Sequence, residues 1–184
     1  MATEKIILGI DPGTNVMGYG LISISGSKMS LIAAGVVKLD KLENQLMKLK
    51  KIFERTIAII DEYKPDELAI EAPFFAKNIQ SMLKLGRAQG VAISAVLTRD
   101  IPVFEYSPKK IKMSVTGTGN ASKEQVAAML QTLLNFKEMP KYLDATDALG
   151  AAVCHHFQKN ISGDKKNYSG WEAFVTENPG KVKK

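Results

Sequence analysis

Four carboxylates occupy positions where a folded chain seldom leaves an acid without a chemical role. Asp11 and Glu71 each close a short apolar run, while Asp144 and Asp147 lie three residues apart in one apolar stretch. On a helix, that spacing puts both side chains on one face, with their Cβ atoms about 5–6 Å apart. Buried carboxylates cost free energy unless a cation neutralises them. No Lys or Arg is adjacent in the sequence to any of the four.

A divalent cation is the simplest neutraliser for such a group. Mg²⁺ typically binds a few carboxylates while it keeps waters and contacts substrate phosphates. Two ions about 3.5–4 Å apart can stabilise both the attacking and the leaving oxygen of an in-line displacement. Asp11, which ends a central apolar run, is the natural bridging ligand. The four acids therefore predict two Mg²⁺ ions, with Mn²⁺ as the alternative, in an enzyme that acts on phosphates.

Each acid also has an ordinary structural explanation. Asp11 begins an Asp-Pro-Gly sequence, which is common in turns. Asp144 could cap a helix, Asp147 could favour its first turn through the helix dipole, and Glu71 could form a salt bridge. All four acids at element ends of one sheet favour a catalytic site over independent caps. The chain shows no Ser-His-Asp arrangement, no P-loop and no paired-cysteine metal spacing.

Composition indicates a cytoplasmic protein with a polyanionic partner. The net charge of +6 and the pI near 9.3 favour nucleic acid over a membrane. A single cysteine, Cys154, excludes an internal disulfide, and no signal peptide is apparent. No segment approaches the roughly 18 apolar residues that a membrane span needs. His155 and His156 are expected to be packing or surface residues.

Apolar patterning predicts an α/β fold with a five-stranded mixed sheet flanked by helices. Strands are expected over 5–10, 17–25, 29–37, 67–71 and 103–106. Helices are expected over 42–60 and 76–98, from Pro108, over 122–134 and over 144–158. The first, fourth and fifth strands should run parallel. Asp11 and Glu71 would then lie at the carboxyl ends of strands, where ligands gather in open sheets.

At this point the chain resembles the RuvC family of bacterial Holliday-junction resolvases, which have the ribonuclease H-like fold. The matching residues are Ile10–Gly20, Ala69–Glu71, Phe74, Ala76–Asn78, Leu83–Gly90 and Asp144–Leu149, in family order over roughly 5–158. The resemblance implies that the four acids are catalytic metal ligands. It also implies a homodimer that cuts two strands of a four-way DNA junction at symmetric positions in recombination and repair. A branch-migration helicase complex is the further partner that the family implies.

Residues 1–160 are accordingly expected to form a ribonuclease H-like nuclease domain. Residues 161–184 are expected to form a basic, loosely ordered tail that Trp171 and Phe174 could pin to the body. Six lysines against three acids lie between residues 159 and 184.

Four lysines flank the polar segment 115–121, whose backbone N–H groups are expected to be free for a phosphate backbone. These are Lys109, Lys110, Lys112 and Lys123. A solvated basic loop is the plainer explanation, but the resemblance makes Lys112 and Lys123 the candidates for holding the scissile strand. Phe74 matches the family's stacking position, although Phe75 could be the exposed member of the pair.

Two other functions fit parts of the pattern. Asp-Pro-Gly-Thr is similar to the first phosphate loop of actin-like and sugar-kinase domains, but a second Gly-rich phosphate motif is lacking. A non-catalytic junction-binding module would use the acids only as caps. Metal-dependent cleavage would exclude the second alternative, and stabilisation by ATP would support the first.

Overall fold

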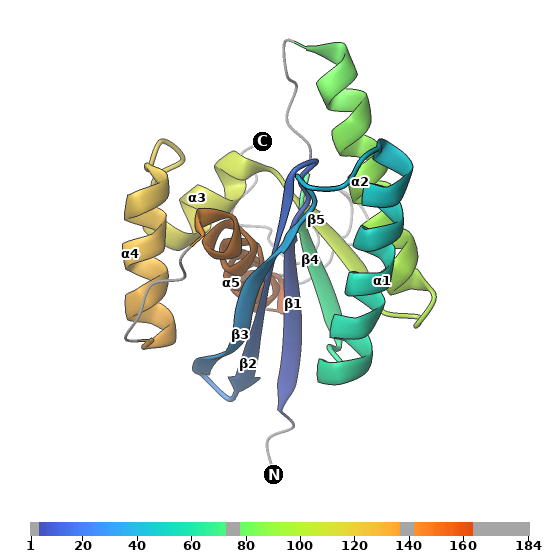
Figure 1. Cartoon of the computed structure of the whole chain (residues 1–184). Coiled ribbons are helices and arrows are strands. Elements are labelled where there is room, and N and C mark those ends of the chain that lie inside the picture. The colour runs from blue at the N-terminus through green and yellow to red at the C-terminus, as the bar shows by residue number, and fades with distance from the viewer. Residues whose placement is uncertain (1–3, 73–77, 137–141, 164–184) are drawn as a thin grey trace, which may run out of the picture.

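Every strand of the central sheet presents alternate side chains to two different layers of helices. The computed structural model describes residues 4–72, 78–136 and 142–163 (Figure 1). Its elements are β1 (Lys5–Asp11), β2 (Val16–Ser25), β3 (Lys28–Lys38), α1 (Gln45–Tyr63), β4 (Glu67–Glu71), α2 (Ile79–Leu97), β5 (Val103–Tyr106), α3 (Pro108–Thr116), α4 (Lys123–Leu134) and α5 (Leu143–Gly163). The predicted five-stranded mixed sheet with flanking helices is confirmed.

The sheet has the strand order β3-β2-β1-β4-β5. The first three strands pair antiparallel, whereas β1, β4 and β5 run parallel, as predicted. A two-residue turn joins β2 to β3, and its Gly26 has a φ of 61°, a conformation that glycine adopts without strain.

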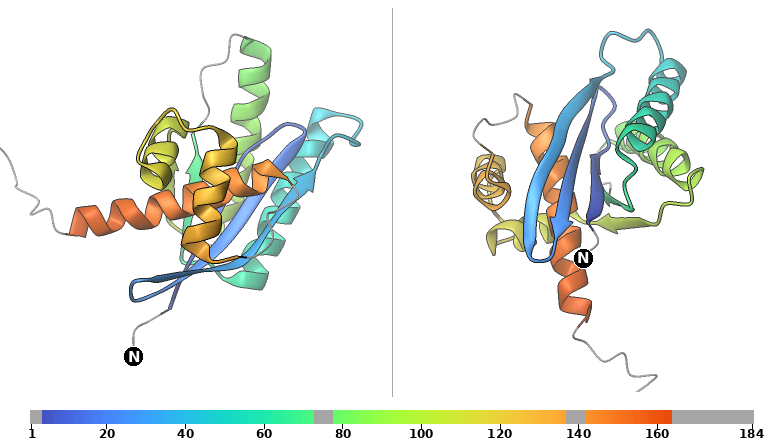
Figure 2. Two further views of the ribbon diagram at one scale, coloured as in Figure 1. Left: turned by 90° about the vertical axis from the view of Figure 1, so that its left-hand side faces the viewer. Right: turned by 90° about the horizontal axis from the view of Figure 1, so that it is seen from below.

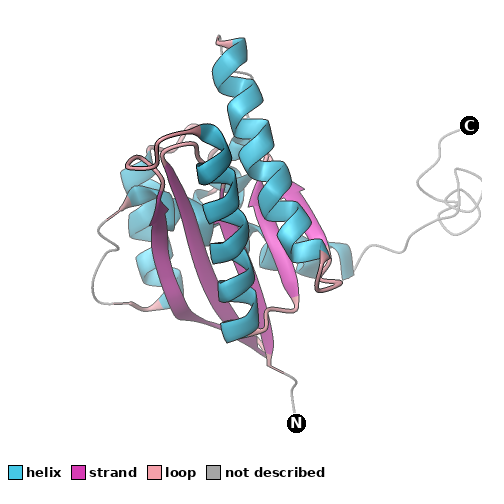
Figure 3. Cartoon of the chain, turned by 45° about the vertical axis from the view of Figure 1, so that its right-hand side comes forward, coloured by secondary structure: helices cyan, strands magenta, loops and turns pink. Residues whose placement is uncertain are grey.

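The two faces of the sheet are covered by different helices (Figures 1 and 2). Leu8 and Ile10 of β1 belong to a core with residues of α1 and α2. Ile7 belongs to the opposite core, to which α3, α4 and α5 contribute. Figure 3 shows α1 and α2 side by side in front of the sheet. Because side chains alternate along a strand, odd-numbered residues of β1 face α5.

Side-chain caps determine where the helices begin. Ser122 and Gln125 form the predicted capping box of α4, and Ser107 caps α3 ahead of Pro108. The first helix begins at Gln45 rather than at residue 42, because Asn44 accepts a hydrogen bond from the third residue after it.

Two further expectations meet the edges of the described residues. The last helix continues to Gly163, past residue 158 and past the expected domain boundary at 160. Residues 164–184 of the expected tail, including Trp171 and Phe174, lie outside the described residues, as do residues 73–77. None of the described helices has the length and apolar character to cross a membrane.

Candidate active site

The register of two parallel strands brings Asp11 and Glu71 together. Gly9 pairs with Ala69 and Ile10 with Ile70, so the next residue of each strand is an acid. Both acids end their strands on the face that α5 covers, because Ala69 belongs to the core on that face. The expectation that these two carboxylates lie at neighbouring carboxyl ends is therefore confirmed.

Glycines in the sheet let the backbone of α5 approach it closely. A Cβ atom at Gly18 would lie 1.9 Å from the carbonyl oxygen of Asp144, and one at Gly9 would lie 1.9 Å from the carbonyl oxygen of Ala148. Only a residue without a side chain fits at either position. This contact brings the first turns of α5, with Asp144 and Asp147, over the carboxyl end of β1.

Three of the four acids line one cavity of about 240 Å³. Asp11, Glu71 and Asp147 share it with the side chains of two lysines. The remaining lining residues are Pro108, Ile111, Lys112, Lys123 and Val126. Asp144 does not line this cavity, but its charge is near enough to raise the pKa of Asp11.

Burial and crowding of like charges shift the pKa of both strand-end acids upward. Burial, followed by the charges of Glu71 and Asp147, raises the pKa of Asp11 to about 8. Burial and the charge of Asp147 raise the pKa of Glu71 to about 7, although Lys123 and Lys112 act in the opposite direction. Their positive charge therefore offsets the carboxylates only in part.

One structural prediction about the acids was wrong. Neighbouring sequence suggested that no basic residue neutralises them, yet the ammonium group of Lys123 donates a hydrogen bond to the carboxylate of Asp147. The two residues are 24 positions apart and lie on α4 and α5, which pack against each other. The predicted capping box was the one available signal, since it puts Lys123 in the first turn of α4.

Two ordinary explanations of the acids do not hold in the structure. Asp11 is a strand residue that pairs with Gly18, so it is not part of a turn. Asp144 lies within the first turn of α5, which begins at Leu143, so it does not cap that helix. The salt-bridge explanation holds for Asp147, whose partner is Lys123.

The five predicted DNA contacts separate into three groups. Lys112 and Lys123 line the cavity of the acids. Lys109 and Lys110 are exposed on α3 and do not line it, and the Nζ atom of Lys110 lies 5.2 Å from the ring centre of Tyr106. Phe74, like Phe75, lies outside the described residues.

The expectation of free backbone N–H groups in the segment 115–121 was wrong at three positions. The N–H of Gly117 donates to the carbonyl oxygen of Met113. The N–H groups of Thr118 and Asn120 donate to the hydroxyl oxygens of Thr116 and Thr118, respectively. Threonine side chains thus satisfy amides that were expected to face a phosphate.

The cavity fits a divalent cation by its donor chemistry rather than by a finished coordination shell. Within the ranges that the structure describes, no three Asp, Glu, His or Cys side chains already surround a point where an ion could sit. The cavity nevertheless holds the oxygen donors of three carboxylates, whose mutual repulsion a cation would relieve. Side-chain rotation of the acids and release of Lys123 from Asp147 would complete such a site.

Known proteins share both the sequence and the architecture of this chain. The family model of crossover junction endodeoxyribonuclease RuvC matches residues 7–155. The chain belongs to the RuvC family. Crossover junction endodeoxyribonuclease RuvC of Cytophaga hutchinsonii is 65% identical over 98% of this chain and 89% of its own. RuvC of Christiangramia forsetii is 60% identical over 100% of this chain and 95% of its own.

A solved RuvC structure has the same fold. RuvC of T. thermophilus in complex with a Holliday junction substrate superposes with a TM-score of 0.81 at 31% identity, over 86% of this chain and 96% of that one. The ribonuclease H-like resolvase fold and the resemblance to RuvC are thereby confirmed. The chain is an endodeoxyribonuclease that acts on crossover junctions, so the actin-like and non-catalytic alternatives are set aside.

Proposed function

We propose that this RuvC chain resolves four-way DNA junctions by paired, symmetric, metal-dependent hydrolysis, with Asp11, Glu71, Asp144 and Asp147 as its catalytic acids. One observation carries the proposal: three of these carboxylates line a single cavity in which crowding raises the pKa of Asp11 to about 8. A site that stores so much negative charge favours a divalent cation. The junction-bound RuvC of T. thermophilus supports the substrate.

The side chains divide the work within the cavity. Two Mg²⁺ ions, or Mn²⁺ in their place, would supply an activated water and charge neutralisation at the leaving oxygen. Asp11 and Glu71 would lend bridging and terminal oxygens, and the two acids of α5 would complete the donor set. Lys112 and Lys123 would hold the scissile phosphate, leaving 5′-phosphate and 3′-hydroxyl ends that ligase can seal. Phe74 would stack on an unpaired base at the junction centre.

A homodimer through α2 would bring two such sites to one junction. Ile79 and Leu83 on α2 are 67% and 50% exposed, which is unusual for large aliphatic side chains in one helix. A Cβ atom at Gly86 or Gly90 would meet no atom within 4 Å, so this face would allow close packing. A two-fold axis here would give the symmetric cuts. The branch-migration helicase complex rests on family membership.

The decisive experiment uses a labelled synthetic four-way junction with a mobile core and a linear duplex of the same sequence. We expect paired symmetric nicks in the junction only when Mg²⁺ or Mn²⁺ is present, and little cutting of the duplex. Binding of the junction without nicks in either metal, across varied core sequences, would contradict the proposal.

The variant Asp144→Asn tests the outermost acid in the same assay. It removes one charge near Asp11 and one potential ligand, while it keeps the size of the side chain. We expect cleavage to fall by at least about 10³-fold, as is typical when a group that stabilises the transition state is lost, with junction affinity retained. Cleavage near the wild-type rate would remove Asp144 from the site. Asp100→Asn, which changes an exposed acid, is the matched control.

A further inference from the structure

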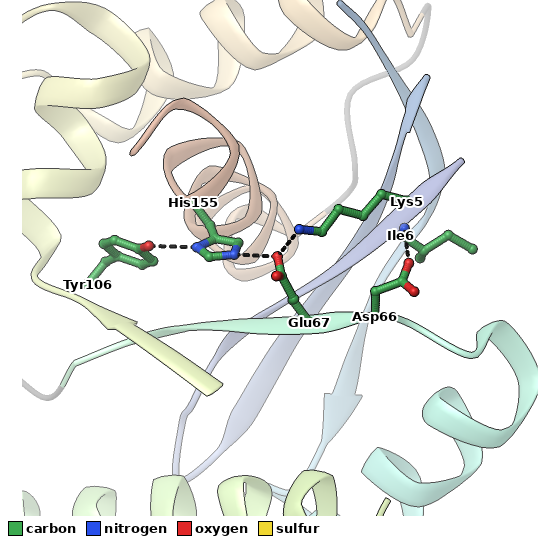
Figure 4. A network of polar contacts seen from close by, with 6 residues as sticks. All are labelled: Lys5, Ile6, Asp66, Glu67, Tyr106 and His155. Atoms are coloured by element: carbon green, nitrogen blue, oxygen red, sulfur yellow. Dashed lines mark hydrogen bonds and ion pairs between the residues drawn. The ribbon is translucent and has the colours of Figure 1, made fainter. Parts of the chain in front are cut away.

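A chain of polar contacts crosses the face of the sheet that α5 covers (Figure 4). The hydroxyl of Tyr106 lies 2.6 Å from Nδ1 of His155, and Nε2 of His155 lies 2.7 Å from Oε2 of Glu67. The ammonium group of Lys5 lies 2.5 Å from the same carboxylate oxygen. His155 is 1% exposed and Glu67 is 6% exposed. We call these four residues the register network.

The protons of the register network can be assigned from its chemistry. Burial, with the nearby Cys154 and Glu67, raises the pKa of Tyr106 to about 12, so its phenol stays protonated. The Tyr106 hydroxyl then donates to Nδ1 of His155, which donates from Nε2 to Glu67. Lys5 balances the charge of that carboxylate. Breaking one link would leave a buried polar group unsatisfied, so the four residues hold one mutual arrangement.

The register network sits on the same three elements that carry the acids. Each element contributes a network member and at least one acid: Lys5 and Asp11 on β1, Glu67 and Glu71 on β4, and His155 with Asp144 and Asp147 on α5. Alternation along each strand puts both members of a pair on the face toward α5. His155 follows Asp147 by eight residues, which is about 12 Å of helix rise.

The packing between α5 and the sheet leaves the position of the helix weakly defined. Its contacts with β1 involve Gly9, Ala148 and Ala152, which are small and offer no interlocking side chains. Burial of such surfaces is non-directional, whereas hydrogen bonds constrain both distance and angle. Directional contacts are therefore needed to define where the helix lies along the strands.

We infer that the register network positions α5 on the sheet and so sets the spacing of Asp147 and Asp144 from Asp11 and Glu71. This inference rests on the proposed function, because it assigns His155, Tyr106 and Glu67 as positioning residues for the metal-binding acids. None of the three lines the cavity of the acids. Their effect must pass through the helix and the two strands.

The test compares Mn²⁺ uptake by the whole chain with its variants. Tyr106→Phe deletes one hydroxyl and Glu67→Gln keeps the size of the side chain, so two mild changes probe opposite ends of the register network. Asp61→Asn is the control, because Asp61 pairs with Arg99 at 2.9 Å between α1 and α2, which carry none of the acids. Uptake is followed by the loss of the free-ion electron paramagnetic resonance signal, and folding by thermal unfolding.

We expect both network variants to need about 10-fold more Mn²⁺ for half-saturation, in the range seen when supporting partners of metal ligands are removed. High Mn²⁺ should restore most of the junction cleavage, and Asp61→Asn should lower the melting temperature without moving the half-saturation point. A shift in the control as large as in the variants, or no shift in either variant that folds, would overturn the inference. Wild-type protein that takes up no Mn²⁺ would instead refute the proposed function and the inference together.

Discussion

Single carboxyl groups in the cavity are held at an electrostatic cost that a cation would relieve. With a pKa near 8 for Asp11 and near 7 for Glu71, Asp11 is mostly protonated at neutral pH before any ion binds. A carboxylate must lose its proton to ligate an ion, so binding a cation releases protons. The acids therefore combine poor stability as a metal-free cluster with a strong preference for divalent cations.

Replacing Asp11 with Asn should stabilise the metal-free protein, and more so at higher pH. The folded pKa of about 8 exceeds the model value of 3.8, so the folded state binds the extra proton between these values. The stability from this group is fully present below pH 4 and is lost as pH rises through 8. Asp11→Asn should raise the melting temperature at pH 8–9 by at least about 2–4 °C, equivalent to 1 kcal/mol for this chain length.

Thermal unfolding in a chelator at pH 5 and pH 9 checks this expectation. The gain should shrink toward pH 5, and Asp100→Asn, which changes an exposed acid, should show no such trend. A destabilised Asp11→Asn at pH 9 would mean that the carboxylate is not under repulsion.

Removing Lys123 should damage cleavage more than junction binding. The side chain lines the cavity, contacts Asp147 and lowers the pKa of both Asp11 and Glu71. Lys123→Ala should lower the single-turnover rate by about 10²-fold, the scale of losing one preorganised donor. Lys109→Ala, which removes an exposed lysine outside the cavity, should mainly weaken binding in a salt-dependent way. Equal rate losses in both variants would argue against a role for Lys123 inside the cavity.

At the scale of elements, the close approach of α5 to the sheet can be tested by one methyl group. A Cβ at Gly18 would overlap the carbonyl oxygen of Asp144, so Gly18→Ala must push the start of α5 away. Overpacking of this kind costs about 1–3 kcal/mol, and the displaced acids should abolish most cleavage. Gly86→Ala is the control for chain stability, because a Cβ there meets no atom within 4 Å. Unchanged unfolding and cleavage in Gly18→Ala would contradict the described contact.

Local patterns predicted the elements and therefore much of the site. Strand alternation and the parallel order of β1 and β4 were enough to bring Asp11 beside Glu71, since register follows once both strands are buried. The capping box at Ser122 was equally readable. The link from Lys123 to Asp147 could not be predicted, because it depends on how α4 packs on α5. Nor could the pattern reveal that threonine hydroxyls satisfy the amides after Gly117.

For the whole molecule, the two helical layers have separate tasks. The layer of α3, α4 and α5 contributes the site, whereas α2 in the other layer exposes large apolar side chains. Leu83→Glu should therefore convert a dimer to monomers, because a charge would be buried at the proposed interface. Light scattering after size exclusion measures the mass, and junction cleavage should change from paired to single nicks.

The control for this change lies on the same helix. Leu97 is 54% exposed at the far end of α2, so Leu97→Glu tests a similar substitution away from Leu83. A wild-type protein that is monomeric at micromolar concentration, or a dimeric Leu83→Glu variant, would contradict the proposed interface.

The most direct test of the proposed metal centre is anomalous diffraction from a crystal of the protein soaked in Mn²⁺. We predict anomalous peaks within about 2.0–2.3 Å of carboxylate oxygens of Asp11, Glu71 and Asp147, with Lys123 moved away from Asp147. Two peaks about 3.5–4 Å apart would match the two-ion arrangement. Crystals with full Mn²⁺ occupancy elsewhere but no peak between these acids would contradict the account.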